Sequence, residues 1–270
     1  MSKGQANRLS AQQVRGGGPR QIFGAIAKVH DNAVADASAA AFHLLVKTYP
    51  ELRFRTRESL SKSEINSKLQ TLDKRLGQTL FLKDAKIRPD GGLIEVQDIS
   101  GSWRIILVSE AKYQGKDVEN IRTGEQVGKN KDQDLMVAGN AIERVHKNIN
   151  EIRNAMLGEL HFPYVVFLQG SNFATSTFEV LRPDGRAVTI SHDKGSMNRI
   201  DRVTAANYCM TINENHCANI IIEVDGKDIM LQAASIYARN EEWSPEEMAH
   251  IMVAVAETSL SVLLQELNLK

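Results

Sequence analysis

The sequence predicts an α/β fold with a central mixed β-sheet flanked by helices on both sides. Short apolar runs that are typical of buried strands alternate along the chain with longer stretches of helical spacing. Hydrophobic residues make up 42% of the 270 positions, which is enough to fill the core of a domain of this size. We expect residues 1–20 to form a flexible basic arm and residues 21–270 to form a single domain.

The arm is predicted from its charge and its glycine content. Its basic residues are Lys3, Arg8, Arg15 and Arg20, and it contains no acidic residue. Residues 16–18 are three consecutive glycines, which favours mobility. A mobile basic arm is suited to wrapping a phosphate backbone, and a disordered tail without a role is the alternative that composition leaves open.

Two helices are expected after the arm. Residues 21–48 are rich in alanine, have apolar residues at helical spacing, and are followed by Pro50. The second helix begins at Ser61, because Ser61 and Glu64 have the spacing of a capping box. Gly77 is predicted to end this helix.

A hairpin that carries charged residues follows. Residues 93–97 and 103–109 read as two strands, and Asp90 lies in the turn that precedes the first of them. Glu110 and Lys112 come directly after the second strand. Because residues two apart on a strand share a face, the two side chains point the same way. The hairpin can therefore bring Asp90, Glu110 and Lys112 together.

These three residue types suit the cleavage of a phosphodiester. Mg²⁺ takes oxygen ligands and commonly holds one or two carboxylates, waters and a substrate phosphate, so Asp90 and Glu110 are the expected metal ligands. Lys112 is positioned to steady the attacking water and the charge that develops on the phosphate. The alternative is a turn aspartate beside a solvated strand end. An apolar strand that ends abruptly in charges favours the catalytic interpretation.

Two similar turns do not need a metal. Asp184 and Asp225 each precede a glycine between strand-like runs, and Asp-Gly is a common hairpin turn. The remaining expected elements are a basic, glycine-containing loop over residues 114–131, a helical stretch over 132–160, a strand over 164–168, a hairpin around 183–185, a helix over 198–208, a strand pair around 225–227, a helix over 229–238, and a last helix that starts at Ser244. Residues 229–231 are thus expected both in a strand and in a helix.

Bulk properties narrow the class of protein. The chain contains no apolar stretch of membrane-spanning length and no signal segment, so we expect a soluble, cytoplasmic protein without a membrane partner. Cys209 and Cys217 form no CxxC pair, and His216 beside Cys217 matches no zinc pattern, so both thiols are expected to be reduced and structural. The net charge is zero, but residues 213–270 carry ten acidic and three basic side chains, which leaves the rest of the chain at plus seven.

Residues 136–144 (MVAGNAIER) offer candidates for reading DNA bases. Asn140 and Arg144 are four apart and share one face if the segment is helical, and Glu143 can brace the arginine. An asparagine amide matches the edge of adenine, and arginine donates to purine acceptors. A solvated helix face is the alternative, and the pattern alone favours it.

Several segments together resemble the EcoRI type II restriction endonuclease family. They are SEAKYQGKD, DQDLMVAGNAIER, HFPYVVFLQGSNF, NRIDRVTAANY and IMLQAASIY, and the resemblance covers nearly the whole chain in order. It implies a PD-(D/E)xK restriction-endonuclease-like core with Asp90, Glu110 and Lys112 as the catalytic set. It also implies cleavage of double-stranded DNA at GAATTC after the G of each strand, which leaves four-base 5′ overhangs and 5′-phosphates.

The resemblance further implies that an extended chain over residues 136–141 lies in the major groove. The residues implied in base recognition are Met136, Ala138, Gly139, Asn140, Ala141, Glu143, Arg144, Arg199 and Arg202. From the basic charge near the metal site, we expect contacts with the DNA backbone from Lys116, Lys129, Lys131 and Lys147. Two positions depart from the family pattern, with Tyr113 in place of a histidine and Ser196 in place of an isoleucine.

A palindromic target and one metal site per chain predict a two-fold homodimer. A methyltransferase of the same specificity is expected in the host as a functional partner. Two other classes remain open at this point. One is a nuclease of the same fold that selects DNA structure, as in repair or junction resolution. The other is a DNA-binding regulator without activity, which requires the loss of catalytic residues that are all present here.

Overall fold

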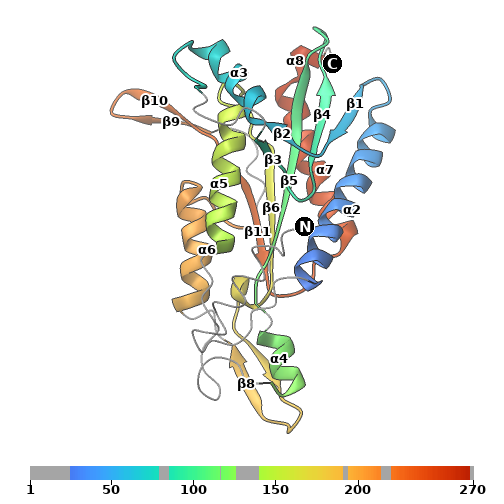
Figure 1. The fold of residues 1–270 in the computed structure, drawn as a ribbon, viewed down its shortest axis with the longest axis vertical. Helices are drawn as coiled ribbons and strands as arrows, with labels where there is room; N and C mark the ends of the chain where they lie inside the picture. The colour runs from blue at the N-terminus through green and yellow to red at the C-terminus, as the bar shows by residue number, and fades with distance from the viewer. Residues whose placement is uncertain are drawn as a thin grey trace.

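The fold is built around a five-stranded mixed sheet (Figure 1). The computed structural model describes residues 25–78, 85–115, 117–125, 140–190, 194–213 and 220–267. The strands lie in the order β1 (Phe54–Arg57), β4 (Leu93–Gln97), β5 (Trp103–Tyr113), β6 (Tyr164–Gln169) and β11 (Ser235–Arg239). Pairing is antiparallel from β1 to β5 and parallel from β5 to β11, which confirms the predicted mixed sheet.

Two long helices cover one face of the sheet, α2 (Ala25–Thr48) and α7 (Pro245–Val262), with the short α8 (Leu264–Leu267) after them. Val34 and Leu45 of α2 and Met252 and Val255 of α7 are fully buried there. Alanines at the α2 contact positions allow the helix to approach the sheet closely. Burial of these apolar side chains between the two helices and the sheet stabilises this half of the fold.

The opposite face is covered by α5 (Asn140–Ala155), with α3 (Lys62–Leu72) and α6 (Lys194–Ala206) beside it (Figure 1). Val145, Ile149 and Ile152 of α5 are buried against Val166 and Leu168 of β6. The prediction of helices on both sides of the sheet is therefore confirmed. The side chains that β5 directs toward α5 lie between these layers.

Helix starts agree with the capping residues of the sequence. Ser61 accepts a hydrogen bond from the Glu64 backbone at 3.1 Å and completes a capping box for α3. Ser244 accepts from the Glu247 backbone at 3.1 Å at the start of α7, with Pro245 at the first helical position. The α3 end was predicted wrongly, because the helix stops at Leu72 instead of Gly77. Asp73 has an extended conformation there, with φ −154°.

The remaining described strands form three antiparallel pairs: β2 (Leu60–Ser61) with β3 (Lys86–Ile87), β7 (Phe178–Leu181) with β8 (Ala187–Ile190), and β9 (Ile220–Val224) with β10 (Lys227–Leu231). The turns around Asp184 and Asp225 join the second and third pairs, as predicted. The helix predicted over residues 229–238 is wrong. Those residues divide between β10 and β11, because residues 232–234 make long-range hydrogen bonds that separate two strands, such as Gln232 Nε2 to Met156 O at 2.7 Å.

The loop predicted over residues 114–131 is also partly wrong, because it contains α4 (Asp117–Thr123). Val118 and Ile121 of this helix pack against Val180 and Ile190 of the β7–β8 pair. A helix of seven residues has little stability of its own, so these tertiary contacts hold it. Residues 126–139 lie outside the described part of the chain.

A β-bulge interrupts the pairing of β4 with β5. Ile94 pairs with Leu107 and Glu95 pairs with Ile105, so Ile106 is the extra residue on β5. A bulge changes which face each following side chain takes. Ile105 joins the core under α5, whereas Leu107 joins the core under α2.

No helix among the described residues is long and apolar enough to cross a membrane. Cys209 is a free, exposed thiol, which is consistent with its predicted reduced state but not with a structural role in the core. The predicted arm at residues 1–20, Cys217 and His216 lie outside the described residues.

The aromatic cluster under α7 generates a stability prediction. Phe167 of β6 is fully buried, and its ring centroid lies 5.7 Å from that of Tyr237 and 5.4 Å from that of Trp243. Phe167→Ala should lower the free energy of unfolding by about 3 to 5 kcal/mol in urea titrations, because it leaves a cavity in this cluster. Leu181→Ala is the control, since this leucine is 63% exposed, and should cost less than about 0.5 kcal/mol. Equal losses in the two variants would contradict this account of the core.

Candidate active site

The structure brings Asp90, Glu110 and Lys112 together on the α5 side of β5. Lys112 Nζ donates to Asp90 Oδ2 at 2.7 Å and also to Glu110 Oε1. The backbone N–H of Ala111 donates to the same Asp90 oxygen at 3.2 Å. Two carboxylates thus share one ammonium group, in the arrangement that the sequence predicted for a metal-dependent site.

Backbone hydrogen bonds hold the turn after Asp90 against β5. Gly91 N donates to Ser109 O at 3.0 Å, and Ser109 N donates to Gly92 O at 3.2 Å. Gly92 has φ +74°, and a Cβ there would lie 2.7 Å from Arg57 O, so the turn requires glycine. The turn therefore holds Asp90 beside the strand that carries Glu110 and Lys112.

Burial strongly affects the charges of this site. The Glu110 side chain is 1% exposed, and burial raises its pKa above the usual value although Lys112 opposes this shift. Burial lowers the pKa of Lys112, but Glu110 and Asp90 outweigh it, so the net pKa is raised and the ammonium stays charged. A buried carboxylate that depends on neighbouring cations is well suited to bind another cation.

Asn148 contacts Glu110 and Tyr164 lies near it, and the sequence did not predict either residue as part of this site. Asn148 of α5 donates from Nδ2 to Glu110 Oε1 at 2.9 Å. Tyr164 of β6 is fully buried, and its burial, followed by the charges of Glu110 and Asp90, keeps the pKa of its hydroxyl well above the usual range. The spacing of Asn148, four residues after Arg144, was the one available signal, because it continues the same helix face.

The donor set fits a hard divalent cation. Glu110 Oε2 is buried and accepts no hydrogen bond of regular geometry from the described residues, so it retains an oxygen for a metal. Asp90 is partly exposed and opens the site to solvent and substrate. No group of three or more His, Cys, Asp or Glu side chains suited to a metal occurs in the described ranges. Two carboxylates completed by waters and a phosphate oxygen are the usual environment of Mg²⁺.

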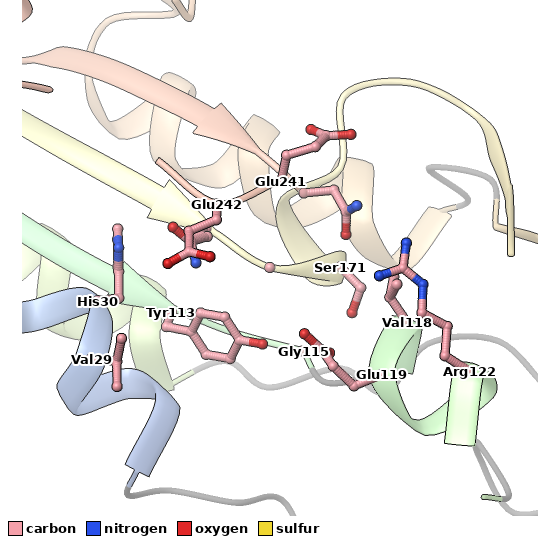
Figure 2. A pocket seen from close by; sticks show the side chains of 13 residues that line it. Val29, His30, Tyr113, Gly115, Val118, Glu119, Arg122, Ser171, Glu241 and Glu242 are labelled. Carbon is pink, nitrogen blue, oxygen red and sulfur yellow. The ribbon is translucent and has the colours of Figure 1, made fainter. Parts of the chain in front are cut away.

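A cavity of about 470 Å³ lies beyond Tyr113, next to α2 and α4 (Figure 2). His30 and Glu242 line one side of it, and Glu119 and Arg122 of α4 line the other. Burial, followed by nearby Glu119, raises the pKa of Tyr113. Tyr113, at the position that departs from the family pattern, therefore presents a neutral hydroxyl to this cavity.

The structure describes the side chains of only some of the residues that were predicted to contact DNA. Glu143, Arg144 and Lys147 are exposed on α5, and Arg202 is exposed on α6. Asn140 and Ala141 belong to the first turn of α5, so the extended conformation expected over residues 136–141 does not reach them. Arg199 belongs to α6, and its side chain is outside the description. The other predicted contacts, at Met136, Ala138, Gly139, Lys116, Lys129 and Lys131, and the departure at Ser196 are not tested by the described side chains.

A mixed sheet that gathers two carboxylates and a lysine beside a strand end defines a phosphodiester-cleaving nuclease. The sequence profile of the restriction endonuclease EcoRI family matches residues 16–270. The type II restriction enzyme RsrI of Cereibacter sphaeroides is 55% identical over 266 residues, covering 98% of this chain and 96% of the relative. The type II restriction enzyme EcoRI of Escherichia coli is 52% identical over 268 residues, covering 98% and 97%. The chain belongs to the EcoRI family of type II restriction endonucleases.

The site also generates a prediction about Asp31 of α2. Burial and then the charge of Asp90 raise the pKa of Asp31 from 3.8 to about 6. A carboxyl with a raised folded-state pKa destabilises the fold above that pKa, and the penalty is lost as pH falls toward the unfolded value. Asp31→Asn should therefore raise the free energy of unfolding by about 1 kcal/mol at pH 8, a value reduced for partial exposure, and by about half as much at pH 5.

Chemical denaturation at the two pH values checks this prediction. Asp36→Asn is the matched control, because Asp36 is exposed on the same helix and should show no gain at either pH. A gain at Asp31 that is the same at pH 8 and pH 5 would exclude the proposed electrostatic cause.

Proposed function

We propose that this enzyme hydrolyses double-stranded DNA at GAATTC in the presence of Mg²⁺. Cleavage after the G of each strand would leave four-base 5′ overhangs with 5′-phosphates. The observation that carries the proposal is the convergence of Asp90, Glu110 and Lys112, with Asn148 joining Glu110 to the helix that carries the candidate base-reading residues. Membership of the EcoRI family supports the specificity.

The catalytic roles follow from the geometry. Asp90 and Glu110 would hold the metal, which supplies charge stabilisation and a more acidic water when bound. Lys112 would release its contacts with the carboxylates and donate to the attacking water and the phosphate oxygens. Its raised pKa keeps it charged for that task. Neither carboxylate needs to act as a nucleophile.

In this proposal, residues of α5, of α6 and of the segment before α5 recognise the DNA bases. Arg144 and Arg202 are exposed on their helices, where they are free to reach a DNA groove, and Arg199 lies one turn before Arg202. Arginine and asparagine donors in the major groove distinguish purine edges. Lys147 is exposed on the same helix and suits contact with phosphate.

A symmetric target also supports a homodimer. The β9–β10 hairpin projects past α5 (Figure 1). It carries apolar side chains that the rest of the described chain leaves exposed. Ile221 is 64% exposed and Ile229 is 41% exposed. Such a surface is commonly buried in assembly. A methyltransferase of the same specificity is the expected functional partner in the host, and the cytoplasm is the expected site of action.

Digestion of a plasmid of known sequence tests the activity. With Mg²⁺ the enzyme should give discrete fragments whose ends, when sequenced, map to GAATTC, and a chelator should prevent cleavage. Asp90→Asn and Lys112→Ala should each reduce cleavage by at least about a thousandfold, because each removes part of the charge stabilisation in the transition state. Both variants should still retain GAATTC DNA in a binding assay without metal.

Asp184→Asn is the control for the aspartate substitution. Asp184 lies in the similar turn of the β7–β8 hairpin, where Oδ1 accepts a hydrogen bond from Arg186 N at 3.0 Å, and an asparagine oxygen can accept the same bond. This control should cleave at the normal rate. Full activity of Asp90→Asn, or fragments whose ends share no sequence, would refute the proposal.

The homodimer is tested by mass without DNA. Sedimentation at micromolar concentration should give about 60 kDa, which is twice the 30.0 kDa of one chain. The value should not change when a short GAATTC duplex is added, apart from the mass of the duplex. A mass of one chain in the absence of DNA would contradict a preformed dimer.

A further inference from the structure

The contact between Asn148 and Glu110 joins two parts of the molecule that have different tasks. Asn148 lies on α5 and is partly buried, whereas Glu110 lies on β5 and is 1% exposed. The amide Nδ2 donates to Glu110 Oε1 at 2.9 Å. Their separation in sequence is 38 residues, so the contact depends on how α5 sits on the sheet.

Asn148 shares one side of α5 with the candidate base-reading residues. Asn140, Arg144 and Asn148 are spaced by four residues, so their positions follow one another along the helix. Eight residues of α-helix rise about 12 Å, which is the distance along the axis between the first and last of these positions. A displacement at the DNA end of a rigid helix is therefore carried to Asn148.

Glu110 Oε1 would have a hydrogen-bond donor even without Asn148. Lys112 Nζ already contacts the same oxygen, Oε1. The hydrogen bond from Asn148 restrains the orientation of the Glu110 carboxylate from α5, which lies on the sheet and is not part of it. Hydrogen bonds weaken steeply with length and angle, so a shift of α5 by about 1 Å would be enough to lose this one.

The rest of α5 allows such a shift to be transmitted as a unit. Val145 and Ile149 lie on either side of Asn148 in the sequence and are buried in the core between α5 and the sheet. His146 Nε2 lies 3.1 Å from Arg202 O, which ties α5 to α6. The two helices that carry the candidate base contacts are therefore connected directly beside Asn148.

We propose that Asn148 is a positioning residue that makes the placement of Glu110 depend on how DNA holds α5. On the correct site, α5 sits where Asn148 can restrain Glu110 in the metal-binding orientation. On a site with one wrong base pair, α5 is displaced and the restraint is lost. This inference rests on the proposed function, because it assumes that Glu110 holds metal and that α5 reads bases.

The experiment measures single-turnover cleavage of two duplexes with Mg²⁺, one containing GAATTC and one with a single base pair changed. Asn148→Ala should slow cleavage of GAATTC by about ten- to a hundredfold, the effect of losing a hydrogen bond to a charged group. Cleavage of the altered duplex should change by less than about twofold, because the contact is already lost there. The ratio of the two rates should fall by the same factor as the GAATTC rate.

A role limited to orienting Glu110 would slow both duplexes equally, and that result would overturn the proposal. Unchanged cleavage of both duplexes would overturn it as well. Asn148→Ser is a second variant, because serine stays polar but is too short to reach Glu110, and it should reproduce the selective loss. Asn154→Ala is the matched control, since Asn154 is exposed on the same helix, and it should leave both rates unchanged.

Two further measurements distinguish a failure of the Asn148 proposal from a failure of the proposed function. Binding of GAATTC DNA without metal should be the same for Asn148→Ala as for the wild-type enzyme, because Asn148 contacts a carboxylate and no base is assigned to it. Wild-type enzyme that leaves GAATTC intact would refute the proposed function and this inference with it. Wild-type cleavage at GAATTC, combined with equal slowing of both duplexes by Asn148→Ala, would refute the inference alone.

Discussion

The site depends on one constraint, which is that the carboxylates of buried Glu110 and partly exposed Asp90 lie close enough together to contact one ammonium group. Charges of the same sign at such short separation repel strongly in a medium of low polarity, so Asp90 and Glu110 need a cation between them. Lys112 supplies it in the structure, with Nζ 2.7 Å from Asp90 Oδ2. Burial of Glu110 and partial burial of Lys112 and Asp90 also have a desolvation cost, which the surrounding hydrogen bonds offset. The same need for a cation is the physical basis of the metal site that we propose at these two carboxylates.

Much of the fold follows from local rules that the sequence makes visible. The capping residues at Ser61 and Ser244 marked the starts of α3 and α7 correctly, because these side chains bond to backbone within three residues. The apolar run of β6 and the turn before β4 were equally clear. The meeting of Asp90, Glu110 and Lys112 was predicted in the same way, since one hairpin and the two-residue period of a strand bring the three side chains together.

The features that were missed depend on contacts distant in the sequence. The short α4 is held by Val180 and Ile190, which lie about 60 to 70 residues further along the chain. The boundary between β10 and β11 depends on hydrogen bonds such as that of Asn207 Oδ1 with Ala234 N at 2.6 Å. Asn148 looked like one more polar residue on a helix face, and only the packing of α5 on the sheet reveals its partner. Local spacing predicts elements well, but it does not predict which surfaces meet.

The bulge at Ile106 determines on which side of the sheet the side chains of Glu110 and Lys112 lie. From Leu107 onward, odd-numbered side chains of β5 lie toward α2, and even-numbered ones, including Glu110, lie toward α5. Insertion or deletion of one residue between the bulge and Glu110 would exchange these two sets and bury the acid among aliphatic residues under α2. The register of β5 between Ile106 and Glu110 therefore decides whether Glu110 can face Asn148 on α5.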